Sequence, residues 1–138
     1  MEEMKWTKDL ATGVEILDKQ HKHYMSVCEK AYKAAKAGSA DLVNALKETY
    51  KAAEEHFVTE EAMMEKLQYP EMDGHKRLHS KFLEMEQVIA KEAASGMDSK
   101  KLAVKIKEEL FDWFVLHIKK NDLKLVKNLD TKKIKQLT

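Results

Sequence analysis

The sequence predicts an all-α protein that folds as an up-down-up-down antiparallel four-helix bundle. Its composition favours helices, because the 138 residues include one proline, four glycines and many Ala, Leu, Lys, Glu and Met residues. Turn-forming residues divide the chain into four long segments, and each segment repeats apolar residues at alternating steps of three and four. Short connections favour antiparallel neighbours, and the length fits a single domain over residues 1–138.

The expected elements follow from the breaks between these segments. Residues 1 to about 15 have no strong period and are expected to form an irregular N-terminal arm, which Trp6 anchors by packing. Residues typical of helix ends and turns then follow at Gly38, Pro70, Gly96 and Asn128. The four helices are expected on either side of the first three breaks, and a short C-terminal helical tail after the last.

The apolar face of each predicted helix also carries histidines or carboxylates. They are His21 in the first helix, His56 and Glu60 in the second, His75 and His79 in the third, and His117, followed by Asp122, in the fourth. Three of them come early in their helices and four come late, so an antiparallel bundle places all seven in one layer. A buried polar group without a partner costs about 1–3 kcal/mol, and a domain with about 5–15 kcal/mol of net stability cannot carry seven. The pattern therefore predicts a metal centre.

Helical geometry decides which of these side chains share a face. Residues four apart do so, as in the pairs His56 with Glu60 and His75 with His79. His117 and Asp122 are five apart, a net rotation of about 140° in an ideal helix. Either Asp122 approaches from the neighbouring side, or a π-bulge turns it onto the face of His117.

Other polar or soft side chains are interpreted as structural. His23 lies off the apolar face of the first helix and is expected at the surface. Cys28 is on that face and is expected to pack in the core. In the third helix, Met85 is assigned to the buried stripe together with Phe82 and Ile89.

The donor set narrows the choice of metal. Five imidazoles and two carboxylates suit iron, zinc, copper or manganese, and the single cysteine excludes a thiolate cluster. Seven side chains are too many for one ion and suit two ions bridged by both carboxylates. An oxide or hydroxide bridge would lower the remaining positive charge. Because histidines outnumber carboxylates, the set favours reversible chemistry over oxygenation.

With these residues identified, the chain resembles the hemerythrins, in particular the single-domain bacterial hemerythrin-like proteins. The resemblance rests on four motifs: Asp18 to His21, His56-Phe57 with Glu60-Glu61, His75 with His79, and Trp113 to Asp122. It implies two iron ions bridged by an oxo or hydroxo group and by Glu60 and Asp122. One iron would take His75, His79 and His117, and the other would take His21 and His56 and keep an open site for dioxygen.

The resemblance also implies a water-excluding pocket around that open site. Its wall would consist of Phe57, Trp113, Phe114 and Ile118. The family commonly has leucine where this chain has Phe114, so the pocket is expected to be narrower here.

Three functions are compatible with such a centre. The first is reversible dioxygen binding, for storage, delivery or scavenging. The second is a di-iron redox enzyme that reduces peroxide or nitric oxide, and the third is an oxygen or redox sensor that acts through a separate partner. No acid or base is expected beside the ligands, because Glu61 lies off the apolar face, so a binding protein rather than an enzyme is expected.

Charge and hydropathy limit the partners. Charged residues make up 36% of the chain and leave a net charge of +1, which disfavours a nucleic-acid footprint. There is no signal-peptide pattern and no apolar run of about 18 residues, so a cytoplasmic protein without membrane contact is expected. Besides dioxygen, an oxygen-consuming protein is a conceivable partner, and a monomer is expected.

Overall fold

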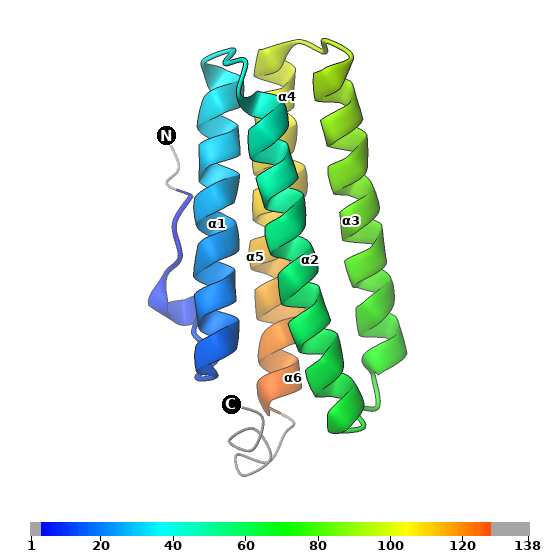
Figure 1. The fold of residues 1–138 in the computed structure, drawn as a ribbon. Coiled ribbons are helices and arrows are strands. Elements are labelled where there is room, and N and C mark those ends of the chain that lie inside the picture. The colour runs from blue at the N-terminus through cyan, green and yellow to red at the C-terminus, as the bar shows by residue number, and fades with distance from the viewer. Residues whose placement is uncertain (1–3, 128–138) are drawn as a thin grey trace.

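The structure, a computed structural model, describes residues 4–127 and contains helices and no strand over that range. The first three long helices are α1 (Glu15–Lys36), α2 (Leu42–Lys66) and α3 (Met72–Ala94). The fourth segment comprises α4 (Ser99–Lys105), η2 (Ile106–Asp112), α5 (Trp113–His117), η3 (Ile118–Asp122) and α6 (Leu123–Lys127). The segments run alternately up and down (Figure 1), which confirms the predicted bundle.

The connections are short because local signals end each helix within a few residues. Gly38 and Gly96 follow α1 and α3 with φ values of 61° and 87°, a backbone region that glycine enters without strain. The carboxylate of Asp98 accepts a hydrogen bond from the Lys101 backbone N–H at 3.1 Å and caps α4. The break at Asn128 and the expected C-terminal helical tail lie outside the described residues.

From residue 4 onward, the N-terminal arm is irregular except for one short 3-10 turn, η1 (Lys8–Leu10). Trp6 is partly buried against the core, and the Lys22 ammonium lies 4.4 Å from the centre of its ring. The arm therefore packs along α1 through the tryptophan, as the sequence predicts.

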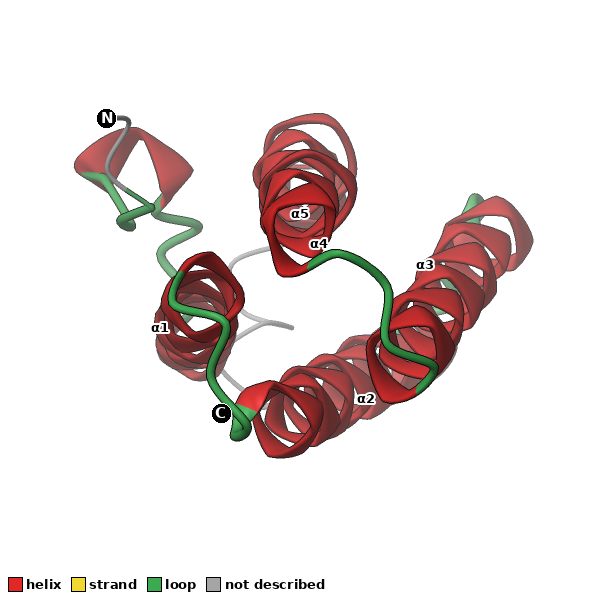
Figure 2. Ribbon diagram, turned by 90° about the horizontal axis from the view of Figure 1, so that it is seen from above, coloured by secondary structure: helices red, strands yellow, loops and turns green. Residues whose placement is uncertain are grey.

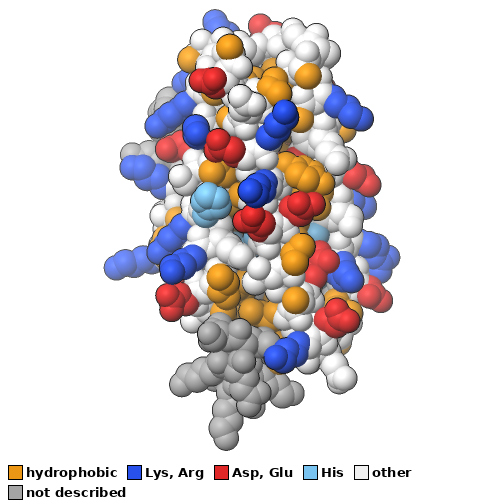
Figure 3. Space-filling view, viewed as in Figure 1, with side chains coloured by type: hydrophobic (Ala, Val, Ile, Leu, Met, Phe, Trp, Pro, Cys, Tyr) orange, Lys and Arg blue, Asp and Glu red, His pale blue; other side chains and the backbone are white. Residues whose placement is uncertain are grey.

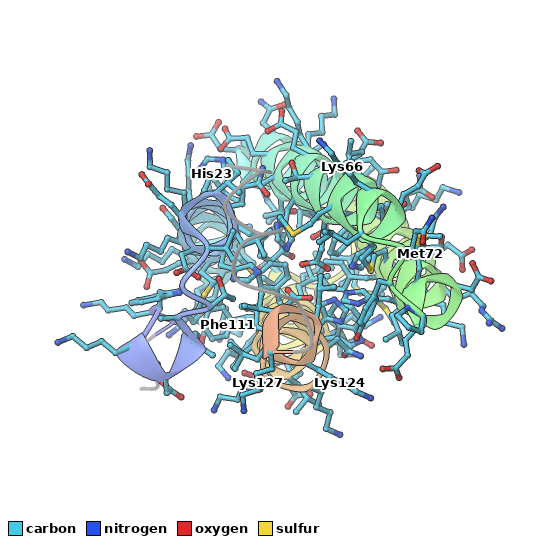
Figure 4. The ribbon with its side chains drawn as sticks, turned by 90° about the horizontal axis from the view of Figure 1, so that it is seen from below. His23, Lys66, Met72, Phe111, Lys124 and Lys127 are labelled. Carbon is cyan, nitrogen blue, oxygen red and sulfur yellow. The ribbon has the colours of Figure 1, made fainter. Side chains whose placement is uncertain are left out.

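Seen from above, the helical segments are arranged around a common axis (Figure 2), and α1 packs against α2 and α4, and α2 against α3. One large hydrophobic cluster lies between them, with two smaller clusters beside it. Aromatic and aliphatic side chains fill it, including Tyr24, Phe82, Leu110 and Phe114. Charged side chains of both signs are interspersed over the face shown in Figure 3. His23 is exposed and projects outward from α1 (Figure 4), and Cys28 is buried, as predicted. Among the described helices, none is long and apolar enough to cross a bilayer.

Candidate metal centre

The structure brings all seven predicted ligand residues together in one buried layer. The residues are His21 from α1, His56 and Glu60 from α2, His75 and His79 from α3, His117 from α5 and Asp122 from η3. None of them is more than 4% exposed. They form two sets of possible ligand atoms, and all atoms within a set lie within 4.8 Å of one another.

The two sets differ in their histidines and share their carboxylates. We call His75, His79 and His117 the three-histidine group and His21 and His56 the two-histidine group; Glu60 and Asp122 belong to both sets. The two oxygens of Glu60 face different groups. Oε1 lies 2.6 Å from His75 Nε2 and 3.0 Å from His79 Nε2, whereas Oε2 lies 3.4 Å from His56 Nε2.

Asp122 divides its oxygens in the same way. Oδ1 lies 3.1 Å from His75 Nε2 and 3.2 Å from His117 Nε2, whereas Oδ2 lies 2.9 Å from His21 Nε2. Each carboxylate thus offers one oxygen to each histidine group. This is the geometry that a pair of ions bridged by two carboxylates requires.

A π-helical segment explains how Asp122 reaches the centre. Residues Ile118–Asp122 form η3, directly after His117. The wider π turn cancels the rotation that five residues would give in an α-helix, so Asp122 returns to the face of His117. Of the two alternatives left by the sequence, the π-bulge is the one present. A second π segment, Ile106–Asp112, was not predicted.

The donor atoms themselves fit a metal. The Nε2 atoms of His21 and His56 lie 3.1 Å apart, and His117 Nε2 lies 3.2 Å from the Nε2 atoms of both His75 and His79. Lone pairs that converge in this way suit a shared cation better than hydrogen bonds with one another. Among the described residues, Glu60 Oε2 is also buried without a hydrogen-bond partner, and a metal would satisfy it.

Without a metal, protons compensate the buried carboxylates. Burial alone would lower the pKa of His56, but Asp122 and Glu60 outweigh it and raise that pKa to about 9. Against the same effect of burial, these carboxylates also raise the pKa values of His75 and His117 to about 9. Burial would raise the pKa values of Glu60 and Asp122, yet the histidines hold both well below their usual range. Metal binding must therefore release protons from this layer.

Two contacts behind the ligands fix the orientation of their rings. Gln20 donates its amide N–H to Thr59 Oγ1 at 3.0 Å, so its Oε1 accepts from His56 Nδ1 at 2.9 Å. Glu61 Oε2 likewise accepts from His79 Nδ1 at 2.8 Å. In the neutral rings, both contacts place the proton on Nδ1 and leave Nε2 free to bind a metal. The expectation that no acid or base lies beside the ligands is wrong, because the Glu61 side chain reaches His79 from beside the apolar face. The role of Gln20 was missed.

Among the predicted wall residues, Phe114 has a ring contact with both histidines of the two-histidine group. Its ring is buried and lies edge-on to His21 and His56, with centroid distances of 5.7 and 5.8 Å. It thus borders the position that has fewer protein ligands.

The other three predicted wall residues lie differently. Phe57 stacks on His79 with centroids 3.9 Å apart, and Trp113 stacks on His117 at 4.8 Å. Both stacking contacts are with the three-histidine group, and the Phe57 ring also lies 5.8 Å from that of His56 in the two-histidine group. Ile118 is fully buried at the start of η3.

A third buried carboxyl, that of Glu86, lies above the metal layer and was missed from the sequence. Glu86 is 2% exposed, whereas Met85, assigned to the buried stripe, is 37% exposed. The Tyr24 hydroxyl donates to Glu86 Oε1 at 2.6 Å, and Thr49 Oγ1 lies 3.1 Å from Oε2. These two hydroxyls, from α1 and α2, favour the inward position of Glu86 over that of Met85.

The fold and the centre together define a helical-bundle domain with a buried metal site of histidines and carboxylates. A family model, the Hemerythrin HHE cation binding domain, matches residues 12–129, and the chain belongs to the hemerythrin family.

Several curated proteins called bacteriohemerythrin are similar to this chain. The protein of Campylobacter jejuni is 30% identical over 91% of this chain and 94% of its own length. The protein of Ralstonia nicotianae is 29% identical over 83% of this chain and 80% of its own length. The protein of Pseudomonas aeruginosa is 26% identical over 88% of this chain and 78% of its own length.

Proposed function

We propose that this chain is a non-heme di-iron protein that binds dioxygen reversibly. The observation that supports this most is the division of both carboxylates between the two histidine groups. In the proposal, His75, His79 and His117 hold one iron, and His21 and His56 hold the other. Glu60 and Asp122 bridge them, together with an oxo or hydroxo group.

The unequal number of histidines gives the centre its reactive side. An iron pair, when bound, supplies two electrons and a coordination position for dioxygen. That position belongs on the two-histidine side, where one protein ligand fewer is available. Gln20 keeps His56 in the tautomer that binds metal, so this side retains its two nitrogen ligands.

The surroundings of this side favour binding over further reaction. The buried Phe114 ring borders both histidines and offers no proton, so it excludes water and supplies no acid. Glu61 cannot serve as that acid, because it meets His79 on the far edge of the ring, at Nδ1. Dioxygen can be released unchanged only if protons reach the site slowly, so these surroundings favour reversible binding.

Peroxide reduction is a second candidate function. It is favoured by one observation, the hydrogen-bonded pair of Tyr24 and Glu86, because the Tyr24 ring stacks on Phe114 at 4.2 Å. A buried phenol this close to the centre is a source of one further electron.

Metal content tests the proposal first. Protein made in iron-replete cells should contain two irons per chain by elemental analysis. His21→Ala should lower this content, whereas His23→Ala, which removes an exposed histidine two residues away, should leave it unchanged. One metal per chain, or full occupancy by zinc, would contradict the assignment.

Dioxygen binding is then tested on the same samples. Anaerobically reduced protein should change its absorbance in air and recover its starting spectrum under argon over repeated cycles. A single irreversible change on first contact with air would favour the redox alternative.

A further inference from the structure

Three polar side chains form a closed cluster in the apolar core, outside the metal layer. They come from three helices: Tyr24 from α1, Thr49 from α2 and Glu86 from α3. Tyr24 and Thr49 are 0% exposed and Glu86 is 2% exposed. The Tyr24 hydroxyl donates to Glu86 Oε1 at 2.6 Å, which is short for a hydrogen bond between two oxygens and typical of a charge-assisted one.

The Glu86 carboxylate accepts a short hydrogen bond from Tyr24, but its surroundings stabilise its negative charge poorly. Thr49 Oγ1 lies 2.8 Å from the Leu46 carbonyl and 3.1 Å from Glu86 Oε2, and its single proton cannot serve both fully. Burial raises the pKa of Glu86 to about 7, although the hydrogen bonds from Tyr24 and Thr49 oppose this shift. The ionised carboxylate is therefore a base strong enough to take a proton from an oxidised phenol.

One aromatic ring separates this cluster from the metal ligands. The Tyr24 ring stacks on Phe114 with centroids 4.2 Å apart and an interplanar angle of 28°. Phe114 in turn lies 5.7 Å from the ring of His21 and 5.8 Å from that of His56. The phenol thus lies behind Phe114, on the side of the two-histidine group.

We propose that Tyr24 is an internal one-electron donor to the metal centre and that Glu86 receives its proton. The inference rests on the proposed di-iron function, because an oxidised centre is what draws the electron. It assigns a redox role to two residues that do not bind the metal.

The donation leaves no uncompensated charge in the core. The O–H bond of Tyr24 breaks, its proton moves along the existing hydrogen bond to Glu86 Oε1, and its electron passes across Phe114 to the centre. The phenol becomes a neutral radical and the buried carboxylate becomes a neutral acid. Burial opposes charge, so this proton transfer favours oxidation of Tyr24 over that of a phenol without such an acceptor.

Hydrogen peroxide is an oxidant that would use this electron. Its reduction to two waters takes two electrons and two protons, and the protons come from solvent. A bound metal pair holding a single reducing electron would supply one of them, and Tyr24 the other. Ascorbate then restores the phenol by giving an electron, while the proton returns from Glu86.

Electron paramagnetic resonance tests the donor directly. Iron-loaded full-length protein is reduced by one electron per chain, mixed with hydrogen peroxide and frozen at intervals. Wild type should show a tyrosyl radical whose signal narrows when the tyrosine rings are deuterated and disappears with ascorbate. The signal should be lost in Tyr24→Phe and in Glu86→Gln, and retained in the control Tyr50→Phe, which alters a tyrosine on the outer part of α2.

Infrared spectroscopy of the iron-free protein tests the pair without the centre. A protonated carboxyl band should be present in wild type below about pH 7 and disappear as the pH rises through that value, where Glu86 becomes the ionised acceptor. This band should be absent from Glu86→Gln and should shift in Tyr24→Phe, because the phenol donates to that group. A band that is the same in wild type and in Tyr24→Phe would overturn the inference.

Measuring iron in every sample distinguishes failure of this inference from failure of the proposed di-iron function. Two irons per chain without a radical, or with a radical that survives Tyr24→Phe, would overturn the role of Tyr24 and leave the proposed function intact. Protein that takes up no iron would overturn the proposed function and, with it, this inference.

Discussion

Replacing Glu86 with glutamine should change how stability depends on pH. The pKa of Glu86 is raised from 4.5 to about 7 in the folded protein, because burial disfavours its charge. Between these values the folded state binds a proton that the unfolded state has lost. The contribution of this proton to the free energy of unfolding is therefore fully present below the unfolded pKa of Glu86 and is lost as the pH rises through about 7.

The pKa shift sets the size of the effect. A shift from 4.5 to about 7 corresponds to about 3 kcal/mol, of which about 2 kcal/mol falls between about pH 5.5 and about pH 8.5. Glutamine has no proton to lose, yet its amide can accept from Tyr24 and donate to Thr49. Glu86→Gln should therefore match wild type within about 1 kcal/mol at the lower pH and exceed it at the higher pH.

Urea unfolding of both proteins at matched metal content measures this difference. Taking wild type minus variant cancels the pH dependence of the metal ligands, which the two proteins share. Tyr24 and Cys28 are the other ionisable groups whose pKa values Glu86 raises, and both stay neutral over this range. A wild-type protein that gains stability relative to Glu86→Gln as the pH rises would refute the reasoning.

Three further predictions concern the metal centre. Asp122→Ala and Glu60→Ala each deprive both positions of a ligand, so they should lose more iron and melt lower than His21→Ala; equal iron content in all three would contradict the bridging roles. Phe114→Leu should speed dioxygen binding, and Phe114→Ala should admit water and speed autoxidation, both by stopped-flow absorbance; rates equal to wild type would remove Phe114 from the path. Glu61→Gln should weaken metal retention against a chelator by about 10-fold or more, and unchanged retention would show that the anionic acceptor is not needed.

The ligand layer could be expected from the sequence because helical periodicity and chain direction determine it. Polar residues on apolar faces are few, and antiparallel topology decides which of them share a level. Even the awkward spacing of His117 and Asp122 left only two geometries, of which η3 is one. The helix ends at Gly38 and Gly96 could also be expected, because they depend on local sequence alone: glycine permits the positive φ values found there.

Contacts from the margin of a helix face could not be expected in the same way. Gln20 and Glu61 lie beside the apolar faces of their helices. Only the length and rotamer of their side chains allow the polar ends to reach His56 and His79. Periodicity places a Cβ atom and says little about a carboxylate several bonds further on. The stacking of Trp113 on His117, by contrast, joins residues that are four apart in α5, a spacing that places both on one face of the helix.

Glu86 is different, because the sequence held a usable signal for it. From His79 the buried face of α3 continues through Phe82, and either Met85 or Glu86 satisfies the next step of three or four. Hydropathy favours the methionine. Tyr24, three residues after His21, and Thr49, seven before His56, continue the apolar faces of their helices to a level above the histidines. Two buried hydroxyls at one level need a polar partner, by the same argument that required a metal for the histidines. Glu86 meets that need and Met85 cannot. A prediction of the buried face should therefore first pair the polar residues of the four helices at each level, and use hydropathy only for the positions that remain.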